Sequence, residues 1–177
     1  TLFENVPVGR YRTSADGRIL DANPALVKMF GYKDRETLLA VNIVDLYVNP
    51  GTDKKFKDEI EGSDNISSFE AEFRREDGTI FWTLDYVHVI REGGGTPLFY
   101  EGSLIDITER KRAEESVRFA EANYRAIVEN APVGIFQSTP EGRYRSVNPA
   151  MAHIFGFESP EEMLAGITDI SSQIHIN

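Results

Sequence analysis

The stretch Asp106-Ile107-Thr108-Glu109-Arg110-Lys111 marks the point where strand-like periodicity gives way to helical periodicity. Behind it, apolar residues recur at spacings of four, three, four and three, as in the a/d seam of a heptad repeat. Thr108 is suited to cap a helix, and Glu109 would lie near the positive end of its dipole. The pattern predicts a helix over residues 108–127. The residues of its apolar seam are Ala113, Val117, Ala120, Tyr124 and Ile127. This seam fits two arrangements equally well: a helix packed on its own domain, or one helix of a dimeric coiled coil.

The predicted helix joins two copies of one sequence pattern. At an offset of 125 places, residues 3–40 match residues 128–165 at 15 of 38 positions, including Asn23-Pro24-Ala25 with Asn148-Pro149-Ala150. So many identities at one offset indicate a tandem repeat. We expect one domain over residues 1–107, the helix over 108–127 and an incomplete second domain over 128–177. An open half-domain exposes strand edges, so we expect that the natural chain continues or that this half pairs with another molecule.

The first copy predicts two short strands, three short helices and three long strands, in that order. Turn residues, caps and apolar alternation place the strands at 9–13, 18–21, 69–74, 80–90 and 97–107, and the helices at 24–30, 34–39 and from 52 to a stop at Gly62-Ser63-Asp64-Asn65. Ile43 to Tyr47 is expected to lead into a loop at Asn49-Pro50-Gly51, and Gly93-Gly94-Gly95 is expected to form a hairpin turn. This order predicts an antiparallel sheet with its helices gathered on one face.

Composition excludes several classes of partner. A net charge of −10, spread along the chain, argues against nucleic acid or anionic lipid. No apolar run reaches the ~18 residues that cross a bilayer, so we expect no membrane contact from this segment and a cytoplasmic location, whether or not the parent protein is anchored. The absence of cysteine rules out disulfides and thiolate ligands.

The residue pattern shows no catalytic constellation. His88 is expected on the outer face of a strand, His153 aligns with Lys28 of the first copy and should be solvated, and His175 falls in the incomplete tail. Zinc-ligand spacings, phosphate-binding loops and nucleophile elbows are also missing from the sequence. We therefore expect this segment to bind or signal rather than to catalyse, whatever enzyme the parent chain carries.

The exit hexapeptide, Trp82 in the fourth strand and Asn23-Pro24-Ala25 at the first helix make the chain resemble the PAS/PAC sensory family. The resemblance covers nearly the whole chain. It implies an α+β fold, with a five-stranded antiparallel sheet, short helices on one face and a pocket between them for a small molecule or cofactor. It also implies dimers, with bacterial effector domains downstream such as two-component histidine kinases or diguanylate cyclases.

By this resemblance, the inner faces of the last three strands would line the pocket. Asp85 stands out, because a carboxylate facing an apolar interior is costly unless it is compensated. It would bind a polar group of a ligand, lie at the pocket mouth, or pair internally with an arginine or tyrosine. The full set of candidates is Phe73, Thr83, Asp85, Val87, Tyr100, Gly102 and Leu104.

The cofactor stays unknown from sequence. Flavin photoreceptors of the family form a cysteine adduct, which a chain without cysteine cannot form. Haem-binding members use a histidine on the third helix, and residues 53–61 contain none, so the resemblance argues against histidine-ligated haem in the first copy. A non-covalent flavin or a small metabolite remains compatible with the sequence.

The outer face of the fourth strand carries Trp82, Leu84, Tyr86 and Ile90, an apolar patch that we expect the linker helix or a second subunit to cover. Homodimer contacts are also expected at Val117 and Tyr124 on the helix. Asp106, Thr108 and Arg110 would transmit the signal, with Asp106 pairing with Arg110 at i+4. The predicted function is a sensory module that detects a small ligand or partner and relays it to an effector. The alternative is a ligand-free dimerisation or docking module.

Overall fold

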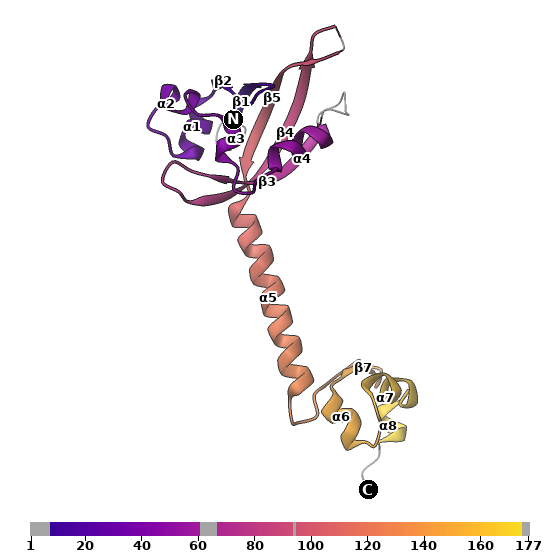
Figure 1. Cartoon of the computed structure of the whole chain (residues 1–177). Coiled ribbons are helices and arrows are strands. Elements are labelled where there is room, and N and C mark those ends of the chain that lie inside the picture. Colours follow the sequence, from indigo (N-terminus) through magenta and orange to yellow (C-terminus); the bar gives the residue numbers. More distant parts are fainter. Residues whose placement is uncertain (1–7, 61–66, 94, 175–177) are drawn as a thin grey trace. The chain divides into compact units, whose positions relative to one another are not determined.

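The computed structural model describes residues 8–60, 67–93 and 95–174. The chain divides into two compact units, residues 1–113 and 114–177. The first unit holds a sheet with short helices, and the single long helix α5 leads out of it (Figure 1). No helix among the described residues combines the length and apolar composition that crossing a membrane requires.

The first unit is built on a five-stranded antiparallel sheet with strand order β2-β1-β5-β4-β3. This order confirms the predicted fold class and places β1 between β2 and β5. The middle of the sheet therefore joins segments about ninety residues apart in the chain, such as Tyr11 and Gly102. The strands are β1 Gly9–Ser14, β2 Ile19–Ala22, β3 Ser67–Arg74, β4 Ile80–Arg91 and β5 Pro97–Asp106.

Four helices connect β2 to β3: α1 Pro24–Phe30, α2 Arg35–Leu39, α3 Ile43–Leu46 and α4 Thr52–Ile60. Asn23 caps α1 as predicted, because its side chain accepts a hydrogen bond from the Leu26 amide at 2.9 Å. The segment Ile43 to Tyr47, for which no helix was predicted, begins with one. There Asn42 accepts from the Val44 amide and starts α3, a helix too short to show a periodic pattern. The predicted stop after α4 lies outside the described residues.

Aromatic rings fill the space between the sheet and its helices. Phe30 of α1 is fully buried and meets Phe73 and Phe81 edge to face, with ring centroids 5.4 and 5.2 Å apart. Phe56 of α4 makes a similar contact with Tyr100, at 5.6 Å. Alternation along β4 buries one face beneath these helices and leaves the other face partly exposed. The helices thus gather on one face of the sheet, as predicted.

Helix α5 spans Thr108–Asn130, past the predicted end at residue 127, and none of its residues is buried. Val117 and Tyr124 of the predicted seam are exposed. The second unit then repeats the first half of the fold around a small core of Val147, Met151, Ala152, Met163 and Ile167. Its elements are β6 Phe136–Ser138, β7 Tyr144–Val147, α6 Pro149–Ile154, α7 Pro160–Gly166 and α8 Ile170–Gln173.

Candidate functional site

Among the described residues of the first unit, one carboxyl group is buried in the core, that of Asp85. Alternation on β4 turns its side chain to the inner face, where it is 3% exposed. The Tyr11 hydroxyl donates to Asp85 Oδ2 at 2.6 Å. Asp85 Oδ1 has no hydrogen-bond partner among the described residues. Of the alternatives left open by the sequence, internal pairing with a tyrosine is the one found, and it satisfies only one of the two oxygens.

Gly102 explains how Tyr11 reaches Asp85 across the intervening strand. In the sheet, Gly102 pairs with Tyr11 on one side and with Val87 on the other. A Cβ at residue 102 would lie 2.5 Å from Tyr11 Cζ and from its hydroxyl oxygen. Only glycine leaves room for the ring. The Tyr11 side chain therefore passes directly over the backbone of Gly102. Tyr11 was not among the predicted site residues. Its contact with Asp85 depends on the order of the strands in the sheet, which the sequence of β1 does not reveal.

Burial sets the protonation of this pair. It raises the pKa of Asp85 to about 8, although the hydrogen bond from Tyr11 acts in the opposite direction. Burial and the nearby Asp85 carboxyl also raise the pKa of Tyr11 well above its ordinary value. The pKa of Tyr47 is raised by burial, with Asp85 and Asp53 adding to the effect. The neutral acid is therefore the favoured form of Asp85 at neutral pH.

A small cavity of about 20 Å³ adjoins Asp85. That volume holds about one water molecule, whereas pockets for drug-sized ligands measure roughly 300–1,000 Å³. Asp53 and Lys57 of α4 stand at its wall as an ion pair 2.9 Å long. Among the predicted pocket residues, four line the cavity: Phe73, Asp85, Tyr100 and Leu104.

The remaining predicted pocket residues have other positions. Thr83 and Val87 are buried in β4 but do not line the cavity, and the Thr83 hydroxyl donates to the Ala71 carbonyl at 3.2 Å. Lining residues that the sequence did not single out, such as Tyr47 and Lys57, come from the helical segment. The described residues contain no group of three or more histidine, aspartate or glutamate side chains placed to hold a metal ion.

A polar junction ties the start of α5 to the sheet. Asp106 Oδ1 accepts from the Thr108 amide at 2.9 Å and from its hydroxyl at 2.6 Å. Thr108 Oγ1 in turn accepts from the Trp82 amide of β4 at 3.0 Å. The prediction that Thr108 caps the helix is therefore wrong: Asp106 acts as the cap, and the Thr108 hydroxyl links the helix to a neighbouring strand.

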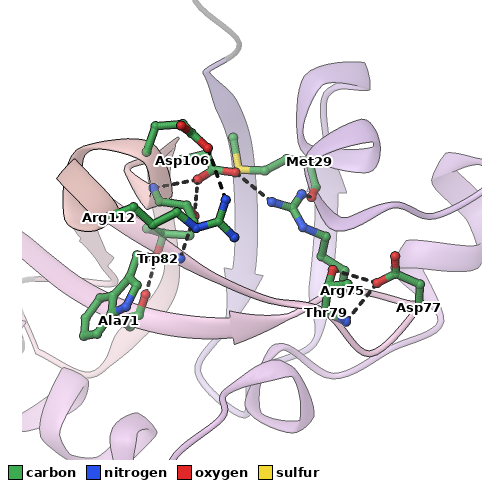
Figure 2. A network of polar contacts seen from close by, with 11 residues as sticks. Met29, Ala71, Arg75, Asp77, Thr79, Trp82, Asp106 and Arg112 are labelled. Atoms are coloured by element: carbon green, nitrogen blue, oxygen red, sulfur yellow. Dashed lines mark hydrogen bonds and ion pairs between the residues drawn. The ribbon is translucent and has the colours of Figure 1, made fainter. Parts of the chain in front are cut away.

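Arg75 holds the other side of Asp106, as Figure 2 shows. Its guanidinium bonds to Asp106 Oδ2 at 2.8 Å and to the Met29 carbonyl, and it lies 4.0 Å from the Phe81 ring centroid. Burial raises the pKa of Asp106, but the hydrogen bonds from Thr108 and the Arg75 charge outweigh it, so the pKa is lowered. The carboxylate is the form that this junction stabilises.

The predicted pair between Asp106 and Arg110 is wrong. Arg110 and Lys111 instead form ion pairs with Glu70 on β3. The i+4 rule applies within a helix, and Asp106 still belongs to the strand, so its side chain points toward Arg75. The Lys111 ammonium also lies 5.0 Å from the Trp82 ring centroid, so the first turn of α5 partly covers the outer face of the sheet.

The outer face is less apolar than the sequence of β4 alone suggested. Trp82, Leu84 and Ile90 are half-buried, while Tyr86 and His88 are exposed. The neighbouring strands add charges, because Arg12 of β1 and Glu101 of β5 form an ion pair next to His88. An open groove of about 540 Å³ runs over this polar region. The predicted apolar patch is thus interrupted by the exposed His88 and by the ion pair between Arg12 and Glu101.

The fold described above, with its antiparallel sheet, its helices on one face and the helix leaving its last strand, agrees with the comparisons of the sequence with protein families. Residues 11–109 match the family model described as PAS domain, and residues 122–175 match a second model of the same description. The chain belongs to the PAS domain family. It is a sensory module of a regulatory, non-catalytic class.

Relatives show the larger proteins in which such domains occur. The probable diguanylate cyclase DgcE of Escherichia coli (strain K12) is 29% identical over 116 residues, which cover 64% of this chain and 10% of that protein. The chain thus spans about a tenth of the length of this relative.

Solved structures support the fold. An RNA-binding Light-Oxygen-Voltage receptor is 22% identical with a TM-score of 0.56, covering 67% of this chain and 35% of its own. A sensory box histidine kinase/response regulator from Burkholderia thailandensis E264 is 19% identical with a TM-score of 0.56, covering 70% and 94%.

Proposed function

We propose that this chain is the cytoplasmic input region of a larger signalling protein, in which the first PAS core receives a signal and α5 relays it to an output domain. Family membership supports the sensory role. The names of the similar proteins support an output domain of the diguanylate cyclase or histidine kinase class. The sequence of the parent chain beyond residue 177 tests the output class.

The junction between sheet and helix is the observation that carries this proposal. Strand β5 ends at Asp106 and α5 begins at Thr108, so no loop separates them. The Thr108 hydroxyl bonds at once to β4 and to the end of β5. A relative shift of these two strands would therefore change the position or angle of the helix.

The relay needs two arrangements of the sheet with different affinities for the signal. Glu70 of β3 binds the first turn through Arg110 and Lys111, so three strands hold the helix. A signal that favours one arrangement would move these contacts together. In a dimer, paired α5 helices would carry the movement through their exposed Val117 and Tyr124 seam.

We further propose that the Asp85 cavity is the input site, taking a small polar ligand in the first PAS core. The unpartnered Asp85 Oδ1 supports a hydrogen-bonding ligand. The volume of about 20 Å³ favours a group no larger than water, and a flavin-sized ligand would require the aromatic core to open. Extraction of the purified protein, followed by absorbance and mass spectrometry, tests for a larger molecule.

A ligand-free docking module is the second candidate, and the aromatic filling of the core favours it. In that case the input would be a partner on the outer face of the sheet, at Trp82 and its neighbours. Trp82→Glu should then weaken dimerisation in analytical ultracentrifugation. An unchanged sedimentation profile and unfolding midpoint would remove this candidate.

Cross-linking tests the relay, and the absence of native cysteine makes single introduced cysteines unambiguous. We expect Val117→Cys to form disulfides between copies faster than Arg118→Cys, whose side chain lies off the predicted seam. Thr108→Val, which removes the hydroxyl at the junction, should change the Val117→Cys rate without changing the unfolding midpoint greatly. Equal rates at both positions would exclude pairing through the seam, and an unchanged rate in Thr108→Val would exclude the junction as its control.

A further inference from the structure

Few groups are available to compensate a charge on Asp85. Tyr11 faces it from β1, Tyr100 from β5 and Tyr47 from the segment after α3, while β3 places Phe69 opposite it. Helix α4 contributes Asp53 and Lys57 to the cavity wall. Among the described residues that line the cavity, Lys57 is the one cation, and it already pairs with Asp53.

An ionised Asp85 would therefore hold one hydrogen bond, in a buried site whose described lining contains one other carboxylate, that of Asp53. Such a charge is costly unless further donors reach it. The neutral acid costs less, because it carries no charge, Tyr11 satisfies Oδ2 and the adjoining cavity has room for about one water. The two protonation states thus require different surroundings.

We propose that Asp85 is a proton-binding site and that loss of its proton to solvent loosens α4 from the sheet. On ionisation, Oδ1 needs a donor, and the candidates are entering water and the Lys57 ammonium. If the Lys57 ammonium turns to Oδ1, its ion pair with Asp53 on the same helix breaks, and if water enters instead, α4 must move away from the sheet to admit it. The step breaks only the O–H bond of the acid, and the proton leaves through the cavity wall at α4.

The same site is connected to the junction with α5. Asp85 pairs in the sheet with Leu104, two residues before Asp106, and Tyr11 lies across Gly102 of the same strand. A change at Asp85 therefore acts on β5 from both of its neighbours. The proton site stands on these contacts alone, and only its transmission to α5 rests on the proposed function.

The sign of the pH dependence of stability follows from the pKa of Asp85, which is higher in the folded protein than in the unfolded chain. Between the ordinary pKa of aspartate and about 8, the folded protein binds more protons, so stability falls as the pH rises. Above about pH 8 this contribution is constant. Within this range the folded protein binds up to one proton more than the unfolded chain. The unfolding midpoint should therefore fall by up to about 5 °C for each unit of pH.

Thermal unfolding of the full chain from about pH 6 to about pH 9 tests the proposal in the wild type, Asp85→Asn and Asp53→Asn. We expect a falling midpoint in the wild type and in Asp53→Asn, and the loss of that slope in Asp85→Asn. The protection of α4 amides against hydrogen exchange, measured relative to the intrinsic rate at each pH, should fall over the same range in the wild type. A slope that persists in Asp85→Asn would overturn the proposal.

Infrared difference spectroscopy gives a readout that does not depend on the folding of a variant. The wild type should show the carbonyl band of a buried protonated carboxyl at about pH 6, lost at high pH. Absence of the band would overturn the proton site. A titrating band with an unchanged distance between spin labels at Val117→Cys in paired copies would uphold the proton site and overturn the relay through α5.

Discussion

The two PAS copies share their first half but differ in what covers it. Phe30 of the first copy is fully buried, whereas its counterpart Phe155 in the second copy is 39% exposed. Tyr11 is 9% exposed and its counterpart Phe136 is 50% exposed. In the first copy β3, β4 and β5 lie against these side chains, while the sheet described for the second copy contains only β6 and β7.

The local structure survives this difference. Asn148 caps α6 as Asn23 caps α1, each accepting from the amide three residues ahead at 2.9 Å. Gly31 and Gly156 follow the first helix of each copy with φ of +78° and +82°, a conformation that favours glycine. Caps and turns therefore form from short-range bonds, whereas burial of the aromatic residues requires strands far away in the chain.

The largest difference is expected from removing the same ring in both copies. Phe30→Ala should destabilise the first unit by about 3–5 kcal/mol, because it leaves a cavity between Phe73 and Phe81. Phe155→Ala should cost less than about 1 kcal/mol, because that ring is already partly solvated. Native-state hydrogen exchange, read separately in α1 and α6, measures both. Equal losses would show that Phe155 is covered in solution.

A smaller difference is expected at the next matched pair. Tyr11→Phe removes the one donor to Asp85 and leaves a buried carboxyl unsatisfied, at a cost of about 1–3 kcal/mol. The reverse change Phe136→Tyr places a hydroxyl at an exposed position and should shift stability by less than about 0.5 kcal/mol. Denaturant unfolding monitored in each unit provides the measurement. A neutral Tyr11→Phe would contradict the buried polar pair.

The capping asparagines sharpen the comparison further. Asn23→Ala and Asn148→Ala should each cost about 0.5–2 kcal/mol, since each removes a helix cap. Asn148 also donates to the Val128 carbonyl near the end of α5, at 3.0 Å. Only Asn148→Ala should therefore quicken hydrogen exchange in the last turn of α5. Faster exchange there in Asn23→Ala would refute this assignment.

The smallest effect is expected at the ion pairs that hold the start of α5. Glu70→Gln weakens its contacts with Arg110 and Lys111 and should cost less than about 1 kcal/mol, because these side chains are partly exposed and screened. Salt should reduce the difference from wild type. Glu129→Gln, an exposed carboxylate near the other end of α5, serves as the matched control. Exchange rates in the first turn should change in the former variant alone.

Periodicity predicted the long elements well, whereas the inward faces of β3, β4 and β5 were expected from the family resemblance, and Phe73, Asp85 and Leu104 of those faces are buried. It missed α3, because four residues are too few to show a helical period. Two further assignments were wrong: Thr108 as the helix cap and Arg110 as the partner of Asp106. The capping rule and the i+4 pairing rule both treat a helix in isolation. The structure places β4, Arg75 and Glu70 beside these groups, and nearby strands then compete for the same hydrogen bonds.

By itself, the sequence determined the repeat and the order of the long elements, since these depend on spacing and on caps within a few residues. The inward position of Asp85 followed from the resemblance of the chain's motifs to the PAS/PAC family. Only the tertiary structure decided that Tyr11 is the partner of Asp85. That contact requires β1 to lie beside β5, and it requires a glycine at residue 102 where the ring crosses. Likewise, the sequence predicted the exit helix α5. Its attachment to β3, β4 and β5 depended on contacts between residues that are far apart in the chain. Such contacts carry no local signal, because the residues that make them are dozens of positions apart.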